Sequence, residues 1–401
     1  MNTKTKLILR IIEVTAFALL ILISAVGFQI VRKSNAITTE GYPGYPPPPT
    51  AGENQLAQAL ATLEAKPLPT ALPDRGVRVG APSEMALAGL DLSVTGLFGA
   101  QVDGDLLTGV VSVSEGMDAV IIDLRTGQTR YLNRIVQKGF MWLQASGNYV
   151  TWVDPSPEVM YSYEFHVFDL SRNVDVIFRR GIIRKPDLKN NIVLWEERRD
   201  GELGIYGYDL NAAKDLTVAT GKGIKTYPRV CSNEWVTYLE NPQEGDLGSA
   251  DLRAHNLVTS EDFSIGTVPF PKASVVGNQH ACDGNRVAWV RIYKPITQTF
   301  PTSDYHVYDL ASRTDQLLPI PAPGFSKILF SKDIVVSTAG HMGYDLAQQQ
   351  LFSVFAGEWA GLNTRGGDLL VSGDRLIWLT GGSSFQTTQR LYTGLIVRDA
   401  K

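Results

Sequence analysis

The sequence predicts an all-β fold: a seven-bladed β-propeller of four-stranded antiparallel blades, preceded by one N-terminal transmembrane helix. The observations are an apolar run near the N-terminus, a proline-rich stretch after it, and a short phrase that recurs through the rest of the chain. A repeat period in the forties with one strand signal per unit is typical of propeller blades. We expect residues 1–33 to be a cytoplasmic tip and membrane anchor, 34–75 a linker, and 76–401 the propeller with an N-terminal closing strand.

The apolar run covers Val14–Val31 and is flanked on both sides by basic residues, Lys4, Lys6, Arg10, Arg32 and Lys33. A helix of this length rises about 27 Å, close to the ~30 Å hydrocarbon core. The larger positive cluster before the run favours a cytoplasmic N-terminus. A cleaved signal peptide is the alternative, with Ser34 and Ala36 as small residues before the cut. We favour an uncleaved signal-anchor, because charges follow the long run at once. The protein is then a single-pass membrane protein with an extracytoplasmic body, periplasmic or on the cell surface.

The stretch after the anchor is rich in proline. Nine of the 21 prolines lie between Pro43 and Pro82. Proline favours extended polyproline conformation and blocks helix and sheet. This composition indicates a semi-rigid stalk between membrane and body. A proline-rich ligand for a partner domain is the alternative.

Each copy of the repeated phrase begins with a turn pair and continues as an apolar strand with a usually aromatic sixth position. The sixth positions, which follow one another by 43, 43, 43, 51, 48 and 41 residues, are Gly109, Trp152, Trp195, Tyr238, Trp289, Ser337 and Trp378. We expect the aromatic side chains to pack between neighbouring sheets, where burial of a Trp removes about 200 Å² from water. Because Gly109 and Ser337 break the pattern, six blades plus a cap is an alternative to seven.

A second marker follows in each unit, an Asp or Asn at the end of another strand: Asp123, Asp169, Asp209, Asn256, Asp309, Asp345 and Asp399. Such side chains accept hydrogen bonds from the backbone of the turn that follows. Two hairpins per unit give four strands, but the last unit ends after its third. We expect Gly76–Thr95, through GVRVG or LDLSVTG, to supply the missing strand, because an open sheet edge leaves backbone groups unpaired.

The run from Ile192 to Glu240 resembles the repeats of TolB-like propellers, a WD-repeat-like group found in exported bacterial and archaeal proteins. The matching residues are Trp195, Glu196, Arg198, Ile205, Tyr206, Tyr208, Asp209 and Pro228. The resemblance extends from about Leu90 to the end of the chain. It implies the propeller fold, in a group whose members bind proteins, peptides or glycans or brace other domains. Function does not follow from such a fold alone.

The composition and motifs argue against several kinds of chemistry. The net charge of −4 gives no basic stripe for nucleic acid. We find no G-x-S-x-G, Ser-x-x-Lys or HExxH motif and no phosphate-binding glycine loop, so we expect no catalytic residues, no metal and no cofactor. The sequence therefore predicts a non-catalytic binding or scaffold module. The alternative is a glycan lyase or hydrolase with its site at the central channel near His280.

The predicted binding face is formed by long hairpins between the second and third strands of several blades. A protein, a peptide or a cell-envelope polysaccharide is the expected partner, since exposed aromatic and arginine side chains often anchor interfaces. The candidate residues are Tyr161, Tyr163, Arg198, Arg291, Tyr293 and Phe300 on the hairpins and His280 at the channel. The alternative is that these loops vary without a binding role.

The two cysteines occupy equivalent positions in adjacent units. Cys231 and Cys282 each precede the aromatic position of their own unit by seven residues. In an oxidising compartment they could form a disulfide between two blades. The alternative is two buried thiols that lie too far apart to bridge.

Overall fold

The computed structural model describes residues 76–114, 116–132, 141–155, 163–181, 183–241, 249–269, 280–293, 302–321, 327–338, 340–363, 367–381 and 389–399. The predicted anchor and linker lie outside these ranges. Within them, no helix has both the length and the apolar character needed to cross a bilayer.

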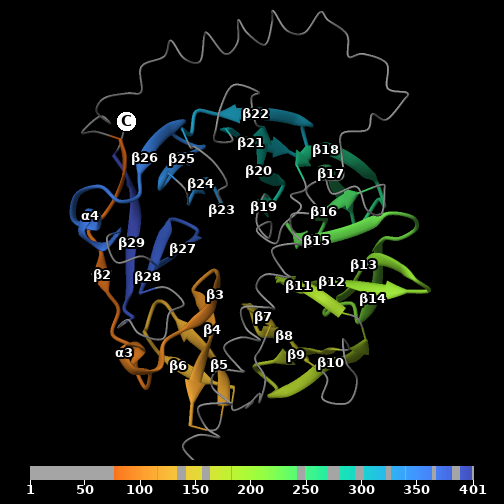
Figure 1. Cartoon of the computed structure of the whole chain (residues 1–401), viewed down its shortest axis with the longest axis horizontal. Helices are drawn as coiled ribbons and strands as arrows, with labels where there is room; N and C mark the ends of the chain where they lie inside the picture. Colours follow the sequence, from red (N-terminus) through yellow and green to blue (C-terminus); the bar gives the residue numbers. More distant parts are fainter. Residues whose placement is uncertain are drawn as a thin grey trace, which may run out of the picture. The chain divides into compact units, whose positions relative to one another are not determined.

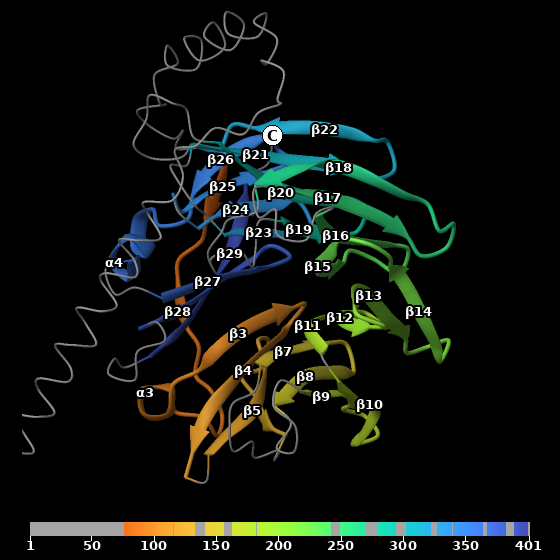
Figure 2. The same ribbon diagram turned by 45° about the vertical axis from the view of Figure 1, so that its right-hand side comes forward.

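Seven antiparallel sheets surround a central axis, as Figures 1 and 2 show. The inner strands are β3 (Phe98–Asp103), β7 (Met141–Ser146), β11 (Ile183–Lys189), β15 (Ile224–Val230), β19 (His280–Asp283), β23 (Ile328–Ser331) and β27 (Gly367–Ser372). The second strands are β4 (Leu106–Val113), β8 (Tyr149–Pro155), β12 (Ile192–Arg199), β16 (Trp235–Asn241), β20 (Arg286–Tyr293), β24 (Ile334–Ser337) and β28 (Arg375–Thr380).

The outer half of each blade is a further pair of strands. The third strands are β5 (Gly116–Asp123), β9 (Tyr163–Asp169), β13 (Glu202–Asp209), β17 (Ser249–Asn256), β21 (Thr302–Asp309), β25 (Met342–Asp345) and β29 (Leu391–Arg398). The fourth strands of the first six blades are β6 (Thr129–Tyr131), β10 (Val174–Gly181), β14 (Lys214–Ala219), β18 (Asp262–Pro269), β22 (Thr314–Leu318) and β26 (Gln350–Ser353). The short helices are α3 (Leu92–Thr95), η1 (Gly357–Trp359) and α4 (Ala360–Asn363). The prediction of seven blades, rather than six and a cap, is confirmed.

The seventh blade is completed by the beginning of the described chain. Strand β1 (Val77–Val79) pairs antiparallel with β29, and β2 (Ser83–Glu84) pairs further along the same strand. The carboxylate of Asp399 accepts a hydrogen bond from Gly76 N at 3.0 Å. The GVRVG segment therefore supplies the closing strand. The other candidate, LDLSVTG, forms α3 instead, because Asp91 caps a helical turn through Ser93 N.

Apolar side chains fill the space between every two neighbouring blades. Seven buried clusters, one per blade-to-blade seam, account for the described core. The repeated tryptophans lie in these seams with at most 5% of their surface exposed: Trp152, Trp195, Trp289 and Trp378. The predicted packing role of these aromatic residues is confirmed.

Two copies of the repeated phrase lack the aromatic residue, each for a different structural reason. A Cβ at Gly109 would lie 2.4 Å from Leu97 Cδ1, so a leucine from outside the repeat fills that space. Ser337 is fully buried, and its hydroxyl hydrogen-bonds the Tyr305 hydroxyl at 2.8 Å. Both departures are local substitutions in a seam that is still packed.

The Asp and Asn markers form the predicted turns. In five blades the same side-chain oxygen accepts hydrogen bonds from the backbone N–H groups two and three residues further on, at Asp123, Asp169, Asp209, Asn256 and Asp309. In the sixth, Asp345 accepts from Gln348 N, three residues on. These bonds fix the hairpin between the third and fourth strands.

Candidate functional site

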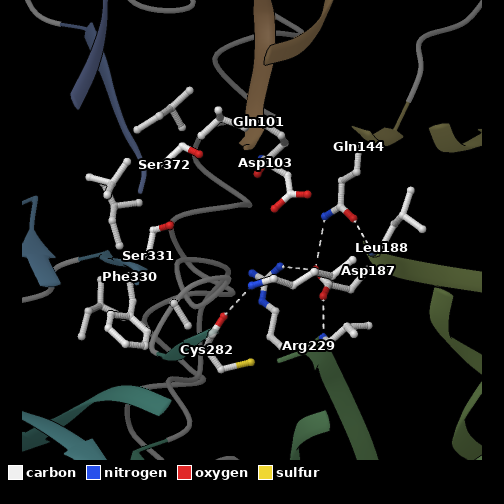
Figure 3. A pocket seen from close by; sticks show the side chains of 18 of the residues that line it. Gln101, Asp103, Gln144, Asp187, Leu188, Arg229, Cys282, Phe330, Ser331 and Ser372 are labelled. Carbon is white, nitrogen blue, oxygen red and sulfur yellow. Dashed lines mark hydrogen bonds and ion pairs between the residues drawn. The ribbon is translucent and has the colours of Figure 1, made fainter. Parts of the chain in front are cut away.

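The axis of the propeller holds a cavity of about 170 Å³ that is lined by residues of the inner strands (Figure 3). Polar side chains occupy the last position of six of these strands: Asp103, Ser146, Lys189, Asp283, Ser331 and Ser372. The turn that follows each strand brings the next blade within hydrogen-bonding distance. The last residue of the inner strand therefore makes a polar contact with another blade at several places around the ring.

These polar side chains bind the blades to one another. Ser146 Oγ donates to Asp103 Oδ2 at 2.5 Å and accepts from Asn190 N at 2.8 Å. Asp283 accepts from Lys332 N at 2.6 Å, and its other oxygen lies 2.6 Å from Lys189 Nζ across the axis. The charged groups at this end of the cavity are therefore engaged in bonds that hold the blades together.

A second polar group lies further along the cavity wall. Figure 3 shows Gln144, Asp187 and Arg229 pointing toward one another from three successive blades. Arg229 Nη1 is 2.9 Å from Asp187 Oδ1, and Val230 N donates to Asp187 Oδ2 at 2.7 Å. The Gln144 amide donates to Asp187 at 3.4 Å and accepts from Leu188 N at 2.9 Å. The buried carboxylate is thus neutralised by an arginine.

His280, the sequence's channel candidate, lines the axial cavity and is 2% exposed. Its Nε2 has no hydrogen-bond partner among the described residues. Burial, together with the charge of Arg229, lowers the pKa of His280 to about 3. The imidazole is therefore neutral near pH 7. Lys327 lines the same cavity, and burial lowers its pKa as well.

The hairpin candidates are distributed over separate blades. Tyr161 and Phe300 lie outside the described residues. Tyr163, in β9, is half-buried against the seam between the second and third blades. Arg198, exposed in β12, donates to Gly201 O of its own hairpin.

The remaining two candidates lie at the end of β20. Arg291 is exposed and pairs through its backbone with Asp304. Tyr293 is the last residue of the strand and pairs through its backbone with Thr302. Arg291 is not among the residues that line the axial cavity.

Sequence reasoning missed a second hollow, which we call the bulge pocket. The register of β3, β7, β11 and β15 against their second strands shifts at the same place in each blade. At each shift one residue has left-handed φ: Gly99 (61°), Trp142 (55°), Lys185 (44°) and Tyr227 (53°). All four line a cavity of about 430 Å³. A bulge adds one unpaired residue to a strand, so alternation of polar and apolar residues does not reveal it.

The bulge pocket lies at the end of the blades where the second strand turns into the third, which we call the hairpin end. Beside the register shifts, Phe98 pairs with Val110 and Met141 with Val153, in the halves of β4 and β8 that lead to the third strands. None of the described hairpin candidates, Tyr163, Arg198 and Arg291, is among the residues that line the bulge pocket.

Comparisons with known proteins show the fold. No protein-family model and no curated protein match the sequence. TolB from Acinetobacter baumannii is 14% identical, with 75% of this chain and 66% of that chain covered and a TM-score of 0.40. An oligogalacturonate lyase in complex with manganese is 9% identical, with 80% and 98% covered and a TM-score of 0.50. This chain is a β-propeller whose structural neighbours include TolB and other propeller proteins, as the sequence resemblance predicts.

A third neighbour differs in how its ring closes. The β-propeller domain of the Trilobed protease from Pyrococcus furiosus is 13% identical, with 77% and 98% covered and a TM-score of 0.50. That domain has an open velcro topology. In the present chain β1 pairs with β29 and completes the last blade.

Proposed function

We propose that this chain is a membrane-anchored, extracytoplasmic β-propeller that acts as a non-catalytic recognition or scaffold module for a protein, a peptide or a cell-envelope polysaccharide. One observation carries the proposal. Charged groups of the axial cavity are engaged between blades, as in the pairs Asp187–Arg229 and Lys189–Asp283, whereas the exposed Trp142 ring and the exposed Gln101 side chain line the bulge pocket at the hairpin end. Binding then takes place on that face, and the axis holds the ring together.

Two observations support the extracytoplasmic placement. The structure joins Cys231 to Cys282 in a disulfide between the fourth and fifth blades, with Cα atoms 4.9 Å apart. Disulfides persist mainly in oxidising compartments. The apolar run Val14–Val31 between basic residues is of a length that spans a bilayer.

The second candidate function is a glycan lyase or hydrolase with its site in the axial cavity. It is favoured by His280, a neutral imidazole at the cavity wall whose Nε2 is without a described partner. Enzymes of this kind tune carboxyl groups upward in pKa near the reacting bond. Within the described ranges, the carboxyl whose pKa is raised is Asp154, to about 6, chiefly by burial. It lies in β8, hydrogen-bonded to Trp152 Nε1, outside the axial cavity.

A capture experiment tests the binding function. The full chain in detergent is used to capture partners from an envelope extract, beside a variant with a shortened 291–304 hairpin. We expect the shortened variant to lose at least one partner. Equal recovery of every partner would count against the hairpin face. Incubation of the full chain with oligosaccharides tests the enzyme reading, because a hydrolase releases new reducing ends and a lyase new carbon–carbon double bonds.

A further inference from the structure

The bulge pocket maintains an unfavourable backbone conformation in three of its four bulges. Left-handed φ costs a side-chain-bearing residue of order 1 kcal/mol or more, whereas glycine adopts it freely. The first blade has Gly99 at this point, but the next three have Trp142, Lys185 and Tyr227. At Gly99 an added Cβ would meet nothing within 4 Å, so the pocket is open there. The chain thus holds three strained side chains around an open space.

The charged groups of the bulge pocket are neutralised within the protein. Lys185 Nζ lies 3.3 Å from Glu196 Oε1, hydrogen-bonds Thr226 Oγ1 at 2.9 Å, and stands 3.2 Å above the centre of the Tyr227 ring. Arg229 pairs with Asp187 at 2.9 Å. Each lining cation therefore has a carboxylate of its own, and the lining offers no net charge to a ligand.

Three uncharged polar groups of the pocket have no hydrogen-bond partner among the described residues, whereas a fourth, the Gln144 amide, is bonded to Asp187 and Leu188. The Gln101 side chain is exposed, and Trp142 is 37% exposed. Among the described residues, no hydrogen bond involves the Gln101 amide, the Trp142 indole N–H or the Tyr227 hydroxyl. The pocket thus presents the exposed Trp142 ring together with an amide, an N–H and an O–H group that can bind a ligand.

We propose that the bulge pocket binds an uncharged sugar ring of a cell-envelope polysaccharide. A pyranose ring has a flat face of C–H groups and a rim of hydroxyls, which match an exposed indole and neutral hydrogen-bonding groups. The cavity of about 430 Å³ falls within the range typical of small-ligand pockets. The inference rests on the proposed recognition function and names the ligand class for its face. An acidic sugar fits less well, because its carboxylate would find every lining cation already paired.

Trp142 provides both the probe and the variant. It is the exposed one of the seven tryptophans, since the other six are at most 7% exposed. Ligand contact at the pocket therefore changes the accessible part of the tryptophan fluorescence. Trp142→Gly removes the ring at a backbone conformation that glycine adopts without strain. We therefore expect this variant to fold, so that a loss of binding can be attributed to the missing ring.

The experiment titrates the full chain in detergent with neutral oligomers of glucose and of N-acetylglucosamine, with an oligogalacturonate as the acidic counterpart, and with an aromatic-rich peptide. Calorimetry and fluorescence measure binding, and thermal unfolding measures stability. We expect a neutral oligomer to bind most tightly. Trp142→Gly should weaken it at least tenfold at an unchanged or raised unfolding temperature, and Trp142→Phe should retain part of the affinity. The control Leu317→Ala, 58% exposed on β22, should bind as the original chain does.

Three results would overturn the inference: no binding of any neutral oligomer, tighter binding of the oligogalacturonate or the peptide, or full affinity in Trp142→Gly. These failures are distinguishable from failure of the proposed function. If the full chain still captures envelope partners in a hairpin-dependent way, the recognition function stands and only the sugar assignment is wrong.

Discussion

Acidification should destabilise the propeller through His280. In the folded protein the pKa of this imidazole is about 3, against an ordinary value of 6.5. Below pH 6.5 the unfolded chain therefore binds a proton that the folded chain does not. The stability that His280 contributes is complete above pH 6.5 and is lost as pH falls toward the folded pKa.

The size of the effect follows from the linkage between proton binding and folding. Each pH unit below 6.5 changes the free energy of unfolding by ~1.4 kcal/mol per histidine held neutral, so lowering the pH from 6.5 to 5.0 costs about 2 kcal/mol. Urea unfolding of the full chain at several pH values measures the slope. His280→Gln, which cannot titrate, is the matched control, and its pH slope in this range should be shallower by that amount.

Direct observation of the ring tests the same reasoning. The His280 imidazole resonances should not titrate between pH 7.5 and 5 while the protein stays folded. A midpoint near 6.5, or identical pH slopes in the original chain and His280→Gln, would refute the burial argument. Such a result would place the imidazole in contact with solvent or with a proton acceptor.

Three further predictions follow from single contacts. Replacing Cys231 and Cys282 together by Ala should lower the free energy of unfolding by about 4 kcal/mol, since their separation is 51 residues; unchanged unfolding in reductant would contradict a bridging role. Asp154→Asn should stabilise the protein above pH 6 by up to about 3 kcal/mol, because burial raises the pKa of Asp154 to about 6 and the amide oxygen can still accept from Trp152. The gain should fade as pH falls through 6, and a pH-independent effect in urea unfolding would be inconsistent with it. Deleting residues 76–84 removes the partners of β29 and should lower the unfolding temperature and promote association at the open edge; light scattering that shows an equally stable monomer would count against this closure.

The blade count could be predicted from the sequence because stacked sheets impose one spacing on the chain. Trp152 and Trp195 are 43 residues apart, and each fills the equivalent position in its own seam. Gly109 and Ser337 depart from the aromatic pattern for reasons that are visible only in the structure. Leu97, which lies outside the repeat, occupies the first seam, and the Tyr305 hydroxyl binds the serine in the other.

The site was less predictable than the fold. His280 could be assigned to the channel, because its position before the turn pair places it on an inner strand. Asp187 and Arg229 come from different blades, and their pairing depends on how two inner strands approach at the axis. The positions of Trp142 and Tyr227 in the pocket depend on bulges. These bulges shift the strand register, and the residues that form them share no recognisable sequence pattern. The sequence therefore did not reveal which residues of different blades meet at the axis, nor where the inner strands bulge.

Hydrogen exchange on the full chain tests most directly whether the hairpin end is the recognition face. Backbone amides at the bulges around Gly99, Trp142 and Lys185 are left out of the regular ladder, so they should exchange readily in the free protein. With an envelope polysaccharide preparation bound, we predict slower exchange at these three bulges and unchanged exchange in β22 and β26. Protection of the outer strands, with the bulges unaffected, would contradict it.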